Sequence, residues 1–155
     1  MNKVETTLLL LRKDNQILLA TKKKGFGAGK YNGVGGKVEP NETIEKAMIR
    51  ECQEEIFVTP TEYSKVGAME FTEYFKGIKE HVVFHLYVAT KWDGTPTESD
   101  EMKPEWFDID KIPYDNMFED DKYWMPYVLD NKKINGFFEF DEKWKLISHR
   151  IEEIN

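Results

Sequence analysis

Three glutamates whose spacing places them on one side of a helix are the residues of this chain best suited to chemistry. Glu51, Glu54 and Glu55 end a run of helix formers over residues 42–56, for which Asn41 is the expected N-cap. At about 100° per residue they continue an apolar stripe that starts in the first turn. Like charges at these spacings repel, and a hard divalent cation with oxygen ligands would offset that repulsion. The alternative is a solvated acidic face on an ordinary surface helix.

The glycine, glutamate and arginine that precede these carboxylates favour metal binding. Glu42 stands six residues after Gly36, and Arg50 stands eight residues after Glu42, directly before the first of the three glutamates. The pattern over residues 36–58 resembles the box of the Nudix hydrolase family, G-x5-E-x7-R-E-U-x-E-E-x-G-U, where U is apolar. Six of its seven fixed positions match, and the exception is Phe57 in place of the second glycine. Since glycine there would let the chain leave the helix in a left-handed conformation, we expect a different helix exit.

The resemblance implies an α/β fold, an α/β/α sandwich around a mixed β-sheet, in a single domain over residues 1–155. It implies hydrolysis of a nucleoside diphosphate linked to another group, with Mg²⁺ or Mn²⁺ as the cofactor. The implied metal ligands are Gly36, Glu51, Glu54, Glu55 and Glu101, and the implied catalytic residues are Glu51, Glu54 and Glu55. Glu101 belongs to a later acidic loop, where by itself it would be one more exposed acid. We interpret Arg50 as orienting a catalytic carboxylate or pairing structurally.

Segments outside the box are similar to one branch of the family, which hydrolyses oxidised purine nucleoside triphosphates. The similarity covers essentially the whole chain. It implies the following substrate contacts: Thr7, Lys22, Phe26, Asn32, Val34, Gly35, Gly36, Lys37, Phe71, Phe118, Asp120 and Asp121. Asp120 and Asp121 match the pair that reads the base edge, and Asn32 is expected opposite them. Phe118 replaces a tryptophan that stacks on the base, so a smaller stacking face is expected here.

The adjacent aspartates have a physical reason to read a base. Two carboxylates in a semi-enclosed pocket cannot both ionise cheaply, so one can hold a proton. The pair then offers a donor and an acceptor, and moving the proton would match the edges of both 8-oxo-dGTP and 2-oxo-dATP. From the residues alone, the alternative is that Asp120 caps a helix and Asp121 follows on the surface.

The resemblance implies release of a monophosphate and pyrophosphate, which would cleanse the nucleotide pool. One alternative is the same chemistry on an unmodified dNTP, a dinucleoside polyphosphate or an ADP-sugar. Another is a Nudix scaffold that binds nucleotides without cleaving them. The net charge of −7 argues against binding a nucleic-acid polymer, and no run of apolar residues is long enough to span a bilayer. The single cysteine suits the cytoplasm, and nothing in the sequence requires more than a monomer.

Alternation of apolar and polar residues predicts the strands that position these groups. Strands are expected at residues 6–11, 16–20, 31–38, 63–75, 80–90 and 105–108, with a closing hairpin of residues 134–140 and 145–151. A second helix is expected at residues 120–129, kinked or ended early by Pro126. The lysine- and glycine-rich segment 22–30 either contacts phosphate or forms a soluble loop. Cys52 is expected in the core, and the three histidines are expected to be ordinary strand or surface residues.

Overall fold

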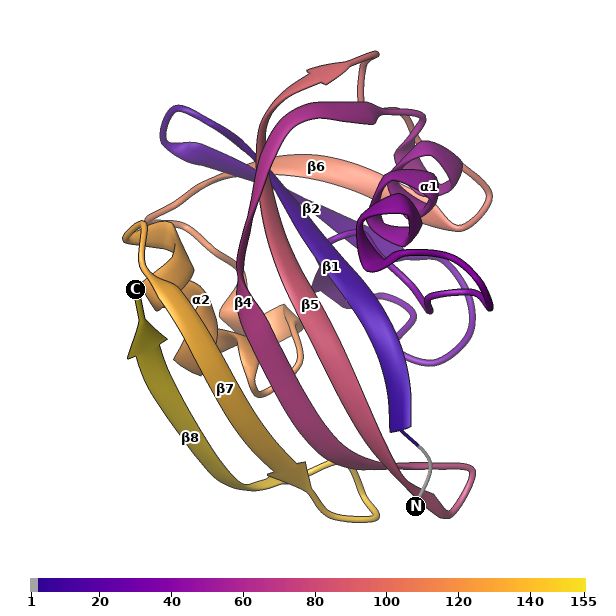
Figure 1. Ribbon diagram of the computed structural model, residues 1–155, viewed down its shortest axis with the longest axis vertical. Coiled ribbons are helices and arrows are strands. Elements are labelled where there is room, and N and C mark those ends of the chain that lie inside the picture. Colours follow the sequence, from indigo (N-terminus) through magenta and orange to yellow (C-terminus); the bar gives the residue numbers. More distant parts are fainter. Residues whose placement is uncertain (1–2) are drawn as a thin grey trace.

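A mixed β-sheet with one helix on each face forms the protein, and the computed structural model describes residues 3–155 (Figure 1). The helices are α1 (Ile44–Ile56) and α2 (Asp121–Leu129), and a 3-10 turn (Tyr114–Asn116) precedes α2. The strands are β1 (Lys3–Lys13), β2 (Gln16–Lys22), β3 (Tyr31–Asn32), β4 (Thr59–Phe75), β5 (Ile78–Asp93), β6 (Met102–Asp108), β7 (Lys133–Phe140) and β8 (Leu146–Ile154). This arrangement confirms the α/β/α sandwich.

The order of the strands along the sheet is β3-β2-β1-β5-β4-β7-β8, and β6 pairs with β2. The β1–β5 and β4–β7 pairs are parallel, and the other pairs are antiparallel. β1 and β2 pair only beside their turn, at Arg12 with Ile17 and Lys13 with Gln16. Beyond that point β2 pairs with β3 and β6, so the two strands diverge and leave an opening between them.

The diverging edge of β1 is completed by the segment that carries the glycine pair. The backbone N–H of Leu9 donates to the carbonyl of Val34 at 2.7 Å, and that of Thr7 donates to Gly36 at 2.9 Å. Only Tyr31–Asn32 of the expected strand 31–38 is regular, and the rest forms single bridges to β1. The glycine pair is thereby held between the sheet and α1.

Alternate residues of β1 pack into two separate cores, one on each side of the sheet. Leu8 and Leu10 belong to the larger core under α2, whereas Leu9 and Leu11 belong to the smaller core under α1. Cys52 lies in the smaller core with no exposed surface, and burial raises the pKa of its thiol to about 12. Its burial confirms the expectation that Cys52 is a core residue. A thiol with so high a pKa is also a poor nucleophile.

Several element boundaries differ from the predicted ones. α1 begins at Ile44 with Thr43 as its N-cap, whose hydroxyl accepts the N–H of Lys46 at 3.1 Å. Asn41, the expected cap, instead has a φ of 66° in the preceding turn. β4, β5 and β6 each extend beyond their predicted spans, because ladder pairing with neighbours continues through polar residues that carry no alternation signal. α2 continues through Pro126 to Leu129.

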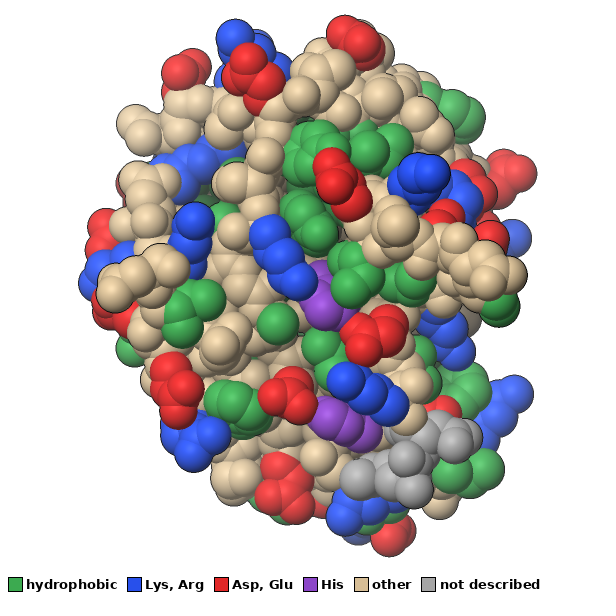
Figure 2. All heavy atoms as spheres, viewed as in Figure 1, with side chains coloured by type: hydrophobic (Ala, Val, Ile, Leu, Met, Phe, Trp, Pro, Cys, Tyr) green, Lys and Arg blue, Asp and Glu red, His purple; other side chains and the backbone are tan. Residues whose placement is uncertain are grey.

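Acidic and basic side chains are interspersed on the face shown in Figure 2, where the described residues form no broad basic patch. Two of the histidines lie on β5, where His81 pairs with Glu70 at 2.9 Å and His85 pairs with Glu5. The third, His149, stacks on Tyr123. The histidines are strand residues, as expected, and none of them lines the cavity described below. No helix among residues 3–155 combines the length and apolar character needed to cross a membrane.

Candidate active site

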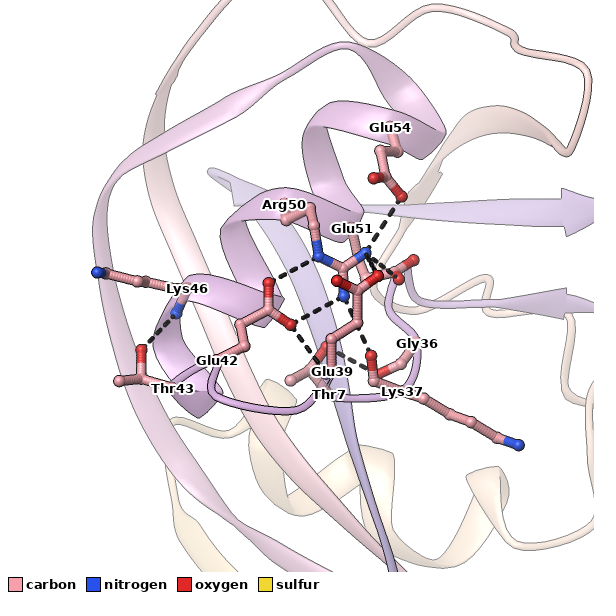
Figure 3. Close-up of polar contacts among 10 residues, drawn as sticks. All are labelled: Thr7, Gly36, Lys37, Glu39, Glu42, Thr43, Lys46, Arg50, Glu51 and Glu54. Atoms are coloured by element: carbon pink, nitrogen blue, oxygen red, sulfur yellow. Dashed lines mark hydrogen bonds and ion pairs between the residues drawn. The ribbon is translucent and has the colours of Figure 1, made fainter.

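Arg50 is the centre of a polar network that holds the carboxylates of α1 (Figure 3). Its guanidinium makes two hydrogen bonds to Glu42, at 2.7 and 3.0 Å. It also donates to Glu51 at 2.7 Å, to Glu54 at 3.2 Å and to the carbonyl of Lys37 at 3.1 Å. The guanidinium lowers the pKa of Glu42 to about 2. Arg50 therefore orients carboxylates of the box, which agrees with the interpretation from sequence.

The glycine pair lies directly against two of the box glutamates. The backbone N–H of Gly35 donates to Glu55 at 2.8 Å. A Cβ atom at Gly36 would lie 2.6 Å from the carboxyl carbon of Glu51, so no larger residue fits there without displacing that glutamate. Burial raises the pKa of Glu55 to about 8, and the nearby charges of Glu51 and Glu101 act in the same direction. Glu101 lies in a loop distant in sequence, yet its charge acts on both Glu51 and Glu55.

The donor chemistry of this cluster fits a hard cation such as Mg²⁺ or Mn²⁺, because every candidate donor is a carboxylate or carbonyl oxygen. In residues 3–155, however, no three acidic, histidine or cysteine side chains are already arranged as a metal site. Glu54 contacts Arg50, and the carbonyl of Gly36 accepts the N–H of Thr7. Only one oxygen of Glu54 and one of Glu51 accept from Arg50, so the second oxygen of each carboxylate could bind an ion while that contact is kept.

A cavity of about 260 Å³ opens beside this cluster, where β1 and β2 diverge. Glu55 lines it next to the glycine pair, so the carboxylates of α1 and the cavity are continuous. Ten of the twelve expected substrate contacts line the same cavity: Thr7, Lys22, Phe26, Asn32, Gly35, Gly36, Phe71, Phe118, Asp120 and Asp121. The other two do not line it. Val34 packs in the smaller core, and the ammonium of Lys37 lies over the Phe75 ring.

Asp120 and Asp121 are buried at the cavity, with 4% and 2% of their surface exposed. The indole N–H of Trp124 donates to Asp120 at 3.0 Å and to Asp121 at 3.1 Å. Burial raises the pKa of Asp120 to about 6, and burial together with the charge of Asp120 raises the pKa of Asp121 well above its usual range. Oδ2 of Asp121 has no partner within residues 3–155. The alternative of a helix cap followed by a surface residue is wrong, because the side chain of Asp120 makes no capping hydrogen bond at the N-cap position and Asp121 is buried.

Aromatic rings stand over one side of the cavity. Phe26 stacks on Phe118 with ring centroids 5.7 Å apart, and the ring of Trp144 lies 4.6 Å from that of Phe26. A Cβ atom at Gly27 would lie 2.7 Å from the Phe118 ring, so this glycine lets the loop approach the aromatic wall closely. Phe26 is half-exposed and lines the cavity, at a position where the family resemblance implies a substrate contact.

The carboxylates of α1 therefore lie beside a cavity that also contains a buried carboxyl pair. Known proteins share this fold. The model of the NUDIX domain matches residues 1–128 of the chain. The chain belongs to the Nudix family. Its box is the segment 36–58 that holds the glutamates of α1.

Two curated Nudix relatives are similar over nearly their whole length. The oxidized purine nucleoside triphosphate hydrolase of Danio rerio is 44% identical over 148 residues, covering 96% of this chain and 94% of the relative. The protein of the same name from Mus musculus is 42% identical over 149 residues, with the same coverage. Among solved structures, a MutT protein from Bacillus halodurans superposes with a TM-score of 0.83 at 25% identity, covering 96% of this chain and 97% of that one.

The residues that line the Nudix cavity but were not predicted from the sequence include Trp144 and Glu73. Trp144 comes from the turn between β7 and β8, and no local pattern connects that turn with the box. Glu73 lies on β4 with 8% of its surface exposed. The strand period could have revealed that Glu73 points inward, because it follows Met69 and Phe71 at intervals of two residues and these two face the larger core.

Proposed function

We propose that this protein hydrolyses oxidised purine nucleoside triphosphates, such as 8-oxo-dGTP and 2-oxo-dATP, to the monophosphate and pyrophosphate. The observation that carries the proposal is the buried pair of Asp120 and Asp121 in a cavity that Glu55 and Gly36 also line. The names of the two vertebrate relatives support the same substrate class. We further propose that the protein uses Mg²⁺ or Mn²⁺ and acts as a cytoplasmic monomer that cleanses the nucleotide pool.

The carboxyl pair would read the base through one shared proton. Trp124 donates to one oxygen of each side chain, so Oδ1 of Asp120 and Oδ2 of Asp121 receive no hydrogen bond from it. Asp121, with the more strongly raised pKa, would hold the proton and donate it to a keto oxygen, while Asp120 accepts an N–H. The carbonyl oxygen of Asn32 accepts the N–H of Gly33 at 2.9 Å, so its amide group can donate to the base.

The residues of α1 would act at the other end of the substrate. A bound Mg²⁺ ion would neutralise the triphosphate and increase the acidity of the attacking water. Glu51, Glu54 and Glu55 would supply the carboxylate ligands, and one of them would accept the proton of the water. Arg50 would keep Glu51 in place throughout, since its guanidinium is anchored on Glu42. Lys22 lines the cavity, and its ammonium group would contact phosphate oxygens.

The experiment is pyrophosphate release from 8-oxo-dGTP, 2-oxo-dATP and dGTP with Mg²⁺, for the wild type, Glu54→Gln and Asp120→Asn. Matched controls are Glu45→Gln and Asp115→Asn, at exposed positions. We expect the wild type to prefer the oxidised nucleotides, Glu54→Gln to lose activity on all three, and Asp120→Asn to lose the preference. Equal rates on 8-oxo-dGTP and dGTP would favour a Nudix hydrolase for another nucleotide. Binding without turnover would favour a non-catalytic scaffold.

A further inference from the structure

Glu73 places a carboxyl group where the strand pattern of β4 calls for an apolar residue. Met69, Phe71 and Glu73 are successive inward positions, and all three line the cavity. Glutamate is rarely buried to this extent unless a partner compensates its charge. Only 8% of the residue is exposed, so most of its contact with water is lost on folding.

No group of the described chain compensates this burial. Within residues 3–155, the Glu73 carboxyl takes part in no hydrogen bond and no ion pair. The charged groups that act on it are both acids, Glu80 on the neighbouring strand and Asp120 in the cavity. Burial and these two charges raise its pKa to about 7. Neither carboxyl oxygen of Glu73 is fully enclosed, so the group stays accessible from the cavity, and packing alone gives no reason for a glutamate here.

We propose that Glu73 is a third base-contacting carboxyl group, which accepts an N–H from the base and so favours purines with an additional N–H donor. The inference rests on the proposed function and deepens it. The base of 8-oxo-dGTP carries donors at N1, at the exocyclic amino group and at N7. Unmodified guanine has only a lone pair at N7, which would face a carboxyl oxygen unfavourably. The keto form of 2-oxoadenine has donors at N1 and at its amino group, and its N7 is also an acceptor.

The three acidic side chains divide these donors among them. Asp120 and Asp121 share one proton and can match a keto oxygen and an adjacent N–H. Glu73 provides an acceptor from a different strand, on β4, while the aspartates precede and begin α2. A base with a third donor therefore gains a contact that the aspartate pair cannot provide.

The experiment compares Glu73→Met and Glu73→Gln with a control, Glu70→Gln. Methionine extends the apolar row of Met69 and Phe71, and Glu70 lies on the same strand outside the cavity lining. The values of kcat and KM would be measured for 8-oxo-dGTP, 2-oxo-dATP and dGTP, together with melting temperatures. We expect Glu73→Met to lower kcat/KM for 8-oxo-dGTP about 10- to 100-fold, mainly through KM, since a hydrogen bond to a charged group is lost. The loss for 2-oxo-dATP should be less than about threefold, because its N7 offers no proton to Glu73.

The melting temperature separates this role from a structural one. Glu73→Met should melt at a higher temperature than the wild type, because it removes an uncompensated buried carboxyl group. Equal losses on both oxidised nucleotides, or a lower melting temperature with a uniform loss of kcat, would overturn the inference. An active wild type whose substrate ratios survive Glu73→Met would overturn only the role of Glu73. A wild type that turns over neither oxidised nucleotide would overturn the proposed function as well.

Discussion

Phe57 ends α1 in the left-handed region, with a φ of 61° and a ψ of 35°, and its N–H donates to Gln53. The sequence predicted a different exit, because the Nudix box has glycine at this position. That expectation is wrong: the chain makes the left-handed exit with phenylalanine. The ring is 58% exposed, so packing holds it weakly. Phe57 therefore carries backbone strain that a glycine would relieve.

The strain can be isolated by comparing Phe57→Gly with Phe57→Ala, since both variants lose the same ring contacts. A left-handed conformation costs a residue with a Cβ atom about 1–2 kcal/mol. Glycine avoids that cost but loses about 0.4–1 kcal/mol more chain entropy on folding. The net expectation is that Phe57→Gly is more stable than Phe57→Ala by about 1 kcal/mol. For a chain of this size the difference corresponds to about 2–4 °C in melting temperature.

Urea denaturation at neutral pH, with the m-values compared, measures this difference. Phe57→Asn is a matched control that tolerates the left-handed region and should fall between the two variants. Activity on 8-oxo-dGTP should remain close to wild type in all three, because the ring lies outside the cavity lining. An alanine variant as stable as the glycine variant would refute the assignment of strain to Phe57.

Three further predictions concern the carboxylates. Arg50→Lys should lower the melting temperature and reduce kcat about tenfold or more, because a lysine ammonium cannot hydrogen-bond Glu42 and Glu51 at the same time. Thermal melts and steady-state assays test this. Burial raises the pKa of Glu73 from 4.5 to about 7, so its contribution to stability is present below pH 4.5 and is lost as pH rises through 7. In urea titrations Glu73→Gln should therefore exceed the wild type in stability at pH 8, and the difference should vanish near pH 4. Trp124→Phe removes a hydrogen bond that lowers the pKa of Asp120, so the acidic limb of kcat/KM should move to higher pH.

The sequence determined the helix of the Nudix box and the grouping of its charges. Residues three and four apart share a helix face whatever the rest of the chain does, so Glu51, Glu54 and Glu55 could be placed together from spacing alone. The interpretation of Arg50 as orienting a carboxylate did not rest on this spacing, and the structure shows its contacts to Glu51 and Glu54. The family resemblance added the residues of the cavity, most of which the fold does bring together.

Tertiary structure decided what the cavity contains and how its groups ionise. Burial of Asp121 depends on the packing of α2 and on Trp124, whereas the sequence alone also allowed a surface position. Trp144 joins the aromatic wall from a distant turn, and Glu73 lines the cavity from β4. These contacts are long-range, and no local period encodes them. Desolvation, which raises the pKa of each buried carboxyl group, exists only once the chain has enclosed the group.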